Sequence, residues 1–198
     1  LLSRRQRQMC IRDRYAQDDE YRPEYLDKMN RYRDSVLSVV AEGSYQYVIV
    51  RAPQCIDRQQ PEQAEILLKD CINQTTSDTR EYAILTSILA FTYQMSNRLE
   101  LQMMSLAESA IADIKGVVKE NNSLRALSEL LYEEGALDRA NKYMKKSMAD
   151  ASFYNARLRN VQASKMLPVI DYSYQLEKEM QRQKLQIFLG VILSLIHI

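Results

Sequence analysis

The sequence predicts an all-α fold in which a helical-repeat array is followed by a long C-terminal helix. Hydrophobic side chains recur at three- and four-residue spacing along almost the whole chain, which is the period of amphipathic helices. Glycine and proline are scarce, with four of each among 198 residues, and this disfavours turn-rich β folds and glycine-rich phosphate loops. Because no run alternates apolar and polar residues, we expect no strands.

Cap and turn residues separate the first four expected helices. Pro23 suits the first turn of the first helix, and Glu42-Gly43-Ser44 ends it. Pro53 lies inside the second helix and should kink it. Pro61 opens the third, and Thr76-Ser77-Asp78 offers N-caps for the fourth. The expected ranges are 23–40, 45–58, 62–72 and 79–95.

The last four expected helices are bounded in the same way. Asn97 separates the fourth helix from the fifth, and Asn121-Asn122-Ser123 begins the sixth. Gly135 stops the sixth helix. A long eighth helix should begin near Tyr154 and pass Pro168. The other expected ranges are 98–119, 124–134 and 137–152.

Three helix pairs share a pattern of small, large, turn, Ala, large and small residues that advances by 38 positions. Small residues at these positions let helix backbones cross closely, and large ones fill the space between repeats. Gln102 replaces the alanine in the second copy, which makes that repeat degenerate. The pattern resembles the tetratricopeptide (TPR) helix–turn–helix repeat, with a period slightly above the usual length of about 34 residues. The three copies are Ala52, Cys55, Gln59, Ala64, Leu68, Cys71; Ala90, Tyr93, Asn97, Gln102, Leu106, Ser109; and Ser128, Leu131, Gly135, Ala140, Met144, Ser147.

Both ends of the chain differ from the rest. Leu1–Arg14 and Leu193–Ile198 fit translations of two complementary DNA strings, the mosaic end of a transposon that is used to prepare sequencing libraries. We therefore expect both segments to be adapter-derived and non-native, and we exclude them from reasoning about the fold. A natural basic leader and apolar tail are the alternative.

Without these ends the chain has no histidine and a slightly negative net charge. The composition therefore excludes Ser/His/Asp and Cys/His catalysis and the usual histidine-containing metal sites. The remaining cysteines, Cys55 and Cys71, fall at helix crossings and fit small core residues, although they could pair if the domain is exported. Glu133-Glu134 fits a solvated surface better than a catalytic pair. We expect no enzyme activity, no metal and no cofactor.

The C-terminal part changes character abruptly. Tyr172–Lys184 is polar and charged, whereas Leu185–Ile192 (LQIFLGVI) is apolar and carries no charge. This predicts the start of a truncated transmembrane helix, since a full span needs about 20 apolar residues. A buried amphipathic end of the repeat array is the alternative. By the positive-inside tendency, Lys178, Arg182 and Lys184 would place the repeats in the cytoplasm.

Three stretches of sequence carry a more specific resemblance, namely DTREYAILTSILAFTY (78–93), SLRALSELLYEEGALDRANKYMKKSMADASFYNARLRNVQ (123–162) and KMLPVIDYSYQLEKE (165–179). They resemble bacterial membrane-anchored transcriptional regulators with a TPR-like sensor region. The resemblance implies a sensor domain over 15–153, a connecting helix over 154–184 and a transmembrane start at 185–192. It places the repeats outside the inner membrane, in the periplasm, against the basic flank, and it puts a helix-turn-helix DNA-binding region beyond this fragment.

A TPR stack binds ligands on the concave face that the first helix of each pair lines. In this sequence that face would carry a mixture of hydrogen-bonding groups, a carboxylate and aromatic rings, suited to a peptide, protein or glycan. The chain has 13 tyrosines, which suit recognition, although helix packing is the better interpretation for Tyr82 and Tyr93. The expected binding residues are Ser87, Phe91, Gln94, Asn122, Arg125, Glu129, Tyr132 and Asn160.

The resulting hypothesis is a non-catalytic sensor or protein-interaction domain that signals through its C-terminal helix to the membrane. This fragment should bind no nucleic acid, and a homodimer is possible. A soluble TPR-like scaffold and the sensor half of a histidine kinase are the alternatives.

Overall fold

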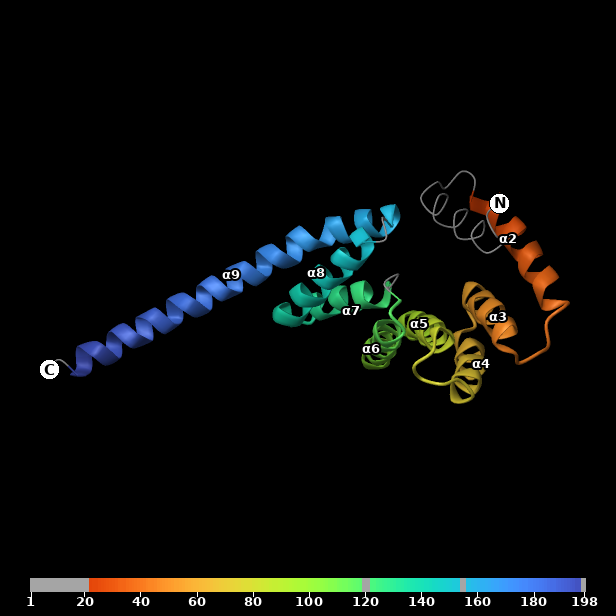
Figure 1. The fold of residues 1–198 in the computed structure, drawn as a ribbon, viewed down its shortest axis with the longest axis horizontal. Coiled ribbons are helices and arrows are strands. Elements are labelled where there is room, and N and C mark those ends of the chain that lie inside the picture. The colour runs from red at the N-terminus through yellow and green to blue at the C-terminus, as the bar shows by residue number, and fades with distance from the viewer. Residues whose placement is uncertain (1–21, 119–121, 154–155, 197–198) are drawn as a thin grey trace. The chain divides into compact units, whose positions relative to one another are not determined.

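The computed structural model describes residues 22–118, 122–153 and 156–196, and within these ranges every regular element is an α-helix (Figure 1). The prediction of an all-α, TPR-like array is confirmed. The helices group into two compact units that divide after Val118. Residues 1–14, Tyr154 and the final two residues lie outside the described ranges, so the adapter origin of the ends stays a prediction.

The first unit contains five described helices, and each of the last four contacts the helix before it. Ser44 caps the second of these helices by accepting a hydrogen bond from the amide of Tyr47 (3.3 Å). Thr79 does the same for Tyr82 (3.2 Å), and both caps satisfy amides that a helix start leaves free. The helices are α2 (Arg22–Leu37), α3 (Tyr45–Asp57), α4 (Pro61–Asn73), α5 (Arg80–Met95) and α6 (Leu99–Lys115).

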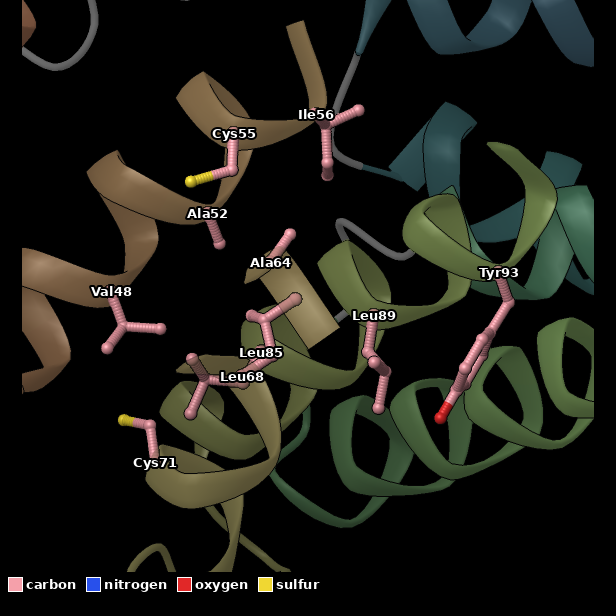
Figure 2. Close-up of a cluster of buried hydrophobic side chains, with 10 residues drawn as sticks. All are labelled: Val48, Ala52, Cys55, Ile56, Ala64, Leu68, Cys71, Leu85, Leu89 and Tyr93. Carbon is pink, nitrogen blue, oxygen red and sulfur yellow. The ribbon is translucent and has the colours of Figure 1, made fainter. Parts of the chain in front are cut away.

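A single hydrophobic core joins α3, α4 and α5 (Figure 2). Leu68 and Leu85 are completely buried at its centre, and Ala52 and Ala64 let the first helix pair approach closely. Cys55 and Cys71 are buried free thiols, so they act as the small core residues that the repeat predicts rather than as a disulfide. Burial raises the pKa of the Cys71 thiol, which disfavours the thiolate form.

The second unit contains α7 (Asn122–Glu133), α8 (Leu137–Phe153) and α9 (Arg157–Ile196). The helix α9 packs on both α7 and α8, as α5 packs on both α3 and α4 in the first unit. Its 40 residues span about 60 Å at 1.5 Å per residue. Within the described ranges, no helix has an apolar stretch that would be sufficient to cross a membrane.

The three turn residues of the repeat adopt the same backbone conformation. Gln59, Asn97 and Gly135 have φ angles of 62°, 53° and 75°. In each turn the next residue donates its amide to the carbonyl of the large repeat residue, Cys55, Tyr93 or Leu131, at 2.9, 3.0 and 2.8 Å. These bonds form a Schellman motif, which satisfies carbonyls at a helix end and requires a left-handed residue. The shared turn therefore lies at the same repeat position in all three copies, as the 38-residue spacing predicts.

The remaining repeat positions are buried in all three copies. Gln102 occupies the alanine position of the second copy with 9% of its surface exposed. Ser109 donates to the carbonyl of Ala83 (2.8 Å), and Ser128 donates to that of Ala140 (2.7 Å). Buried polar residues are therefore tolerated at these crossings, because the serine hydroxyls are paired with backbone oxygens.

Two helices end earlier than the sequence predicts. The helix α2 ends at Leu37, and α6 ends at Lys115 rather than near residue 119. After α6, Val117 takes a φ of 56° and Val118 donates to the carbonyl of Asp113 (2.8 Å), which again forms a Schellman motif. A β-branched residue such as Val117 seldom adopts this conformation. Glycine usually occupies this position after a helix, and because position 117 is not a glycine, the sequence does not indicate that the helix ends here. Pro53 lies inside a single continuous α3.

Candidate functional site

The predicted residues of α7 lie along one face of that helix. Asn122, Arg125, Glu129 and Tyr132 follow a three-four-three spacing, which places their side chains in one row. The Asn122 side-chain oxygen accepts a hydrogen bond from Nε of Arg125 (3.1 Å), and Arg125 donates a second bond to Glu129. The side chains of Arg125 and Glu129 are only 16% and 27% exposed. The face is thus polar, but its two charges neutralise each other.

Tyr132 connects this row to α9. Its hydroxyl lies 3.3 Å from the hydroxyl of Ser173, so the two groups share a hydrogen bond. Sequence reasoning missed Ser173, although it follows Tyr132 by 41 residues, close to the 38-residue period. We call the four α7 residues together with Ser173 the α7 face.

Three polar side chains tie α8 to the same part of α9. Asn141 donates to Asp171 (2.8 Å), and Lys145 forms an ion pair with the same carboxylate (2.7 Å). These hydrogen bonds, from Lys145 first and then Asn141, hold the pKa of Asp171 below its usual range. About two helical turns beyond Asp171, Lys178 pairs with Asp138 (3.0 Å) and lies over the ring of Tyr174. The position of α9 against the helix pair is therefore fixed by directional contacts as well as by packing.

The structure does not bring Asn160 to Tyr132. Asn160 accepts a hydrogen bond from Ser152 at the end of α8 (3.3 Å). It precedes Ser173 by 13 residues, which is about 20 Å along a helix. Asn160 therefore stabilises the connection between α8 and α9, and its role in ligand binding stays a prediction.

The other three predicted residues lie on α5 in the first unit. Ser87, Phe91 and Gln94 follow a four-three spacing and share one helix face. Phe91 is 46% exposed, and Met95, one turn further along α5, is 42% exposed. We call these three residues the α5 face. It belongs to the first unit, whereas the α7 face belongs to the second.

Tyrosines in the first unit serve packing, as the sequence predicts for two of them. Tyr93 is buried and donates to Glu65 (3.3 Å), which also pairs with Arg98 (2.6 Å) and Lys69 (2.7 Å). Burial opposes ionisation of Glu65, but its bonds to Lys69 and Arg98 outweigh that effect and lower its pKa. Tyr82 donates to Glu108 (3.2 Å), and burial raises its pKa. These contacts connect neighbouring helices and leave the two hydroxyls unavailable for a ligand.

One family model matches the chain, and its description is SusR N-terminal TPR domain. The match covers residues 8–165, which include the α5 face, the α7 residues of the α7 face, all three repeats and the first turns of α9, but not Ser173. A search of curated proteins gives no match. TPR domains generally act as scaffolds that bind proteins or other ligands and are typically non-catalytic, so the match agrees with a chain that works by binding.

Proposed function

Because the chain belongs to the SusR N-terminal TPR domain family, we propose that it is the non-catalytic sensor domain of a membrane-anchored transcriptional regulator. A peptide, protein or glycan binds to the exposed face of the first helices of the repeats. The bound state is transmitted through α9 to a membrane anchor that begins near Leu185. The repeat domain lies in the periplasm, and the DNA-binding output lies beyond this fragment.

The observation that carries the proposal is the hydrogen bond between Tyr132 and Ser173. Through this bond, α9 is both part of the α7 face, by way of Ser173, and the helix that leads to the C-terminus. A ligand that competes for the Tyr132 hydroxyl changes a contact of α9 directly. Because Asp171 lies two residues before Ser173 and is held by Asn141 and Lys145, such a change acts next to the contacts that dock α9 on α8.

The chemistry of the α7 face indicates the class of ligand. Arg125 and Glu129 already satisfy each other, so the face offers no unpaired charge to a strongly ionic partner. Asn122 and Tyr132 supply amide and hydroxyl groups, and the ring of Tyr132 adds an apolar surface. This combination suits a neutral polar ligand, such as a peptide backbone or the hydroxyl groups of a glycan.

The far end of α9 supports the anchor. In the segment from Leu185 to Ile192, apolar residues occupy all sides of the helix, and six of them are exposed. A helix that is apolar all round needs a non-aqueous environment. The proposal assigns that environment to the bacterial inner membrane.

A soluble scaffold is the second candidate, and the outer surface of α6 favours it. Met104, Ile111 and Ile114 are each more than half exposed there. Apolar residues gathered on a surface mark protein-interaction sites. In that case the chain binds a protein through α6, and α9 has no part in the response. The sensor half of a histidine kinase would share the domain and differ only in its output.

Hydrogen exchange tests the proposal on the full chain held in phospholipid vesicles. The probes are a mixture of neutral maltooligosaccharides, a mixture of neutral tetrapeptides and, as a matched control, a mixture of anionic tetrapeptides. We expect a neutral probe to slow amide exchange in α7 and to alter exchange in residues 165–178 of α9 at the same concentrations. Tyr132→Phe should weaken both effects, because it removes the shared hydroxyl while it keeps the ring.

Two results would contradict the proposal. One is a probe that protects α7 while α9 exchanges at an unchanged rate, which would remove the signalling step. The other is a chain that stays in solution when it is mixed with the vesicles and floated, which would remove the anchor and favour the scaffold.

A further inference from the structure

A stripe of exposed apolar side chains runs along α9 with a regular spacing. Val169, Tyr172, Leu176 and Met180 begin the stripe, and Ile187 and Val191 continue it. With Gln183 in the remaining position, the steps between successive members are three, four, four, three, four and four residues. The six apolar members are between 45% and 70% exposed. We call these seven residues the α9 seam.

The α9 seam does not face the rest of its own unit. The buried residues of α9 that pack on α7 and α8 are Ala163 and Ile170. At 3.6 residues per turn, the middle of the seam lies about 120° around the helix from them. Packing within the second unit therefore leaves the seam uncovered, and its apolar members need another partner.

The spacing of the seam is that of a helix paired with a copy of itself. A three-four-four pattern repeats every 11 residues, and apolar residues in such a repeat keep one side of a helix facing a partner helix through a slight right-handed supercoil. Gln183 is the polar exception, and a single polar residue in a seam fixes the alignment of the partners. Lys165, one repeat before Leu176, would bring two ammonium groups together, so the paired region begins after it.

Charges beside the seam determine the direction of the partner. Glu179 and Lys184 flank it on opposite sides and are five residues apart. In a parallel pair, residues with this separation meet across the seam, so each glutamate faces the lysine of the other copy. In an antiparallel pair, each flank faces the same flank, and like charges meet. Within the described part of the chain, neither side chain forms an ion pair or a hydrogen bond.

Gly190 agrees with close approach at the end of the seam. It lies inside α9 beside Val191, where glycine lowers helix stability relative to alanine. Apart from its chain neighbours and the backbone of its own helix, a Cβ atom placed on it would meet no atom within 4 Å. Intrachain packing thus gives no reason for a residue without a side chain, whereas a second helix that approaches here would.

We propose that the α9 seam is a self-association surface, and that two copies of the chain pair in parallel and in register from Val169 to Val191. Each seam residue then lies opposite the same residue of the second copy. The pairing joins the two membrane-proximal halves of α9, and it leaves the α7 face on each copy free. A change in α9 docking on one copy thereby reaches the other.

Disulfide cross-linking of the full chain in a mild non-ionic detergent tests this proposal. Gln183→Cys lies in the seam, and Gln181→Cys is a matched control on another side of the same exposed helix. We expect Gln183→Cys to give about ten times more covalent dimer than Gln181→Cys, because only the former brings two Cβ atoms within disulfide reach. Leu176→Cys should give as much covalent dimer as Gln183→Cys. The unsubstituted chain measures any dimer that its own cysteines form.

Charge variants keep the test independent of cysteine chemistry. Glu179→Lys should raise the dissociation constant of the dimer in sedimentation equilibrium, and adding Lys184→Glu should restore it, because the pair is then only reversed. A monomer at all concentrations would overturn the proposal, and so would equal cross-linking at 181 and 183. Cross-linking at only one of 176 and 183 would indicate an antiparallel pair and would overturn the parallel arrangement. None of these readouts depends on a ligand or on lipid vesicles.

Discussion

The two halves of α9 are one continuous helix in two different environments. The first half, up to Lys178, packs on α7 and α8, with Ala163 and Ile170 buried. From Glu179 to Ile196 every described residue is exposed, although most residues after Lys184 are apolar. The first half is thus stabilised by its own domain, and the second half is not.

This difference separates helix formation from tertiary stability. Local sequence makes both halves helical, whereas only the first half has partners within its unit. Isolated helices are marginal in water, so the second half depends on something outside the unit. A membrane around Leu185–Ile192 and a second copy along the α9 seam both supply such a partner.

Truncating one isoleucine in each half should give the largest contrast. Ile170 is completely buried, so Ile170→Ala should destabilise the second unit by about 3 kcal/mol through lost burial and a cavity. Ile187 is 68% exposed, so Ile187→Ala should change the free energy of unfolding of the monomer by less than about 0.5 kcal/mol. Urea unfolding of both variants at low protein concentration measures this. Equal losses would show that the second half is packed within the monomer.

Alanine in place of two glycines should have opposite effects. Gly135 has a φ of 75° in the turn before α8, so Gly135→Ala should cost about 1 kcal/mol from backbone strain alone. Gly190 lies inside α9, so Gly190→Ala should favour the helix by about 1 kcal/mol in the monomer. Neither site has an atom within 4 Å of the new Cβ, so the backbone decides the sign. Thermal unfolding tests the first variant, and helical content by circular dichroism tests the second.

Removing one charged side chain from each half of α9 should change amide exchange only when the charge lies in the first half. Asp171→Asn loses the ion pair with Lys145, so amide exchange in residues 165–178 should become faster. Glu179→Gln in the monomer should leave exchange unchanged in both halves, because within the described residues Glu179 forms no ion pair or hydrogen bond. Exchange measured by mass spectrometry on both variants distinguishes them. Faster exchange along the whole of α9 in Asp171→Asn would mean that the halves open together.

Acidification should loosen the docked half. The folded-state pKa of Asp171 is lowered, so its contribution to stability is present above its ordinary pKa of about 4 and is lost as pH falls through the folded value. The contacts of α9 with α8 should therefore weaken below about pH 4, and Asp171→Asn should reduce this dependence. The ¹³C chemical shift of the Asp171 carboxyl group, titrated by NMR, gives its pKa directly. A titration at or above the ordinary value would contradict the assigned contact.

Much of the fold could be predicted from the sequence because its signals are local. The positions of the repeat were found from spacing, and the structure buries them and gives Gln59, Asn97 and Gly135 the same turn. Tyr82 and Tyr93 were correctly interpreted as packing residues. The end of α6 was missed because Val117 occupies a position that normally shows glycine.

The candidate site was less predictable because its partners lie far apart in the sequence. Helical spacing correctly places Arg125, Glu129 and Tyr132 on one face, but it does not reveal that the first two neutralise each other. Nor does it show that Tyr132 contacts Ser173, or that Asn160 faces Ser152 instead. Those contacts depend on the position of α9 along the axes of α7 and α8. Periodicity within one helix contains no information on this relative position.

The most direct test is residue-resolved hydrogen exchange along α9 of the full chain, measured under conditions where it is monomeric. We expect strong protection of the amides up to Lys178 and a steep fall in protection from Glu179 onward. Protection should return in the second half when the chain is placed in phospholipid vesicles, while the first half stays unchanged. Equal protection along the whole helix of the lipid-free monomer would contradict the account, since α9 would then be one packed element without a free half.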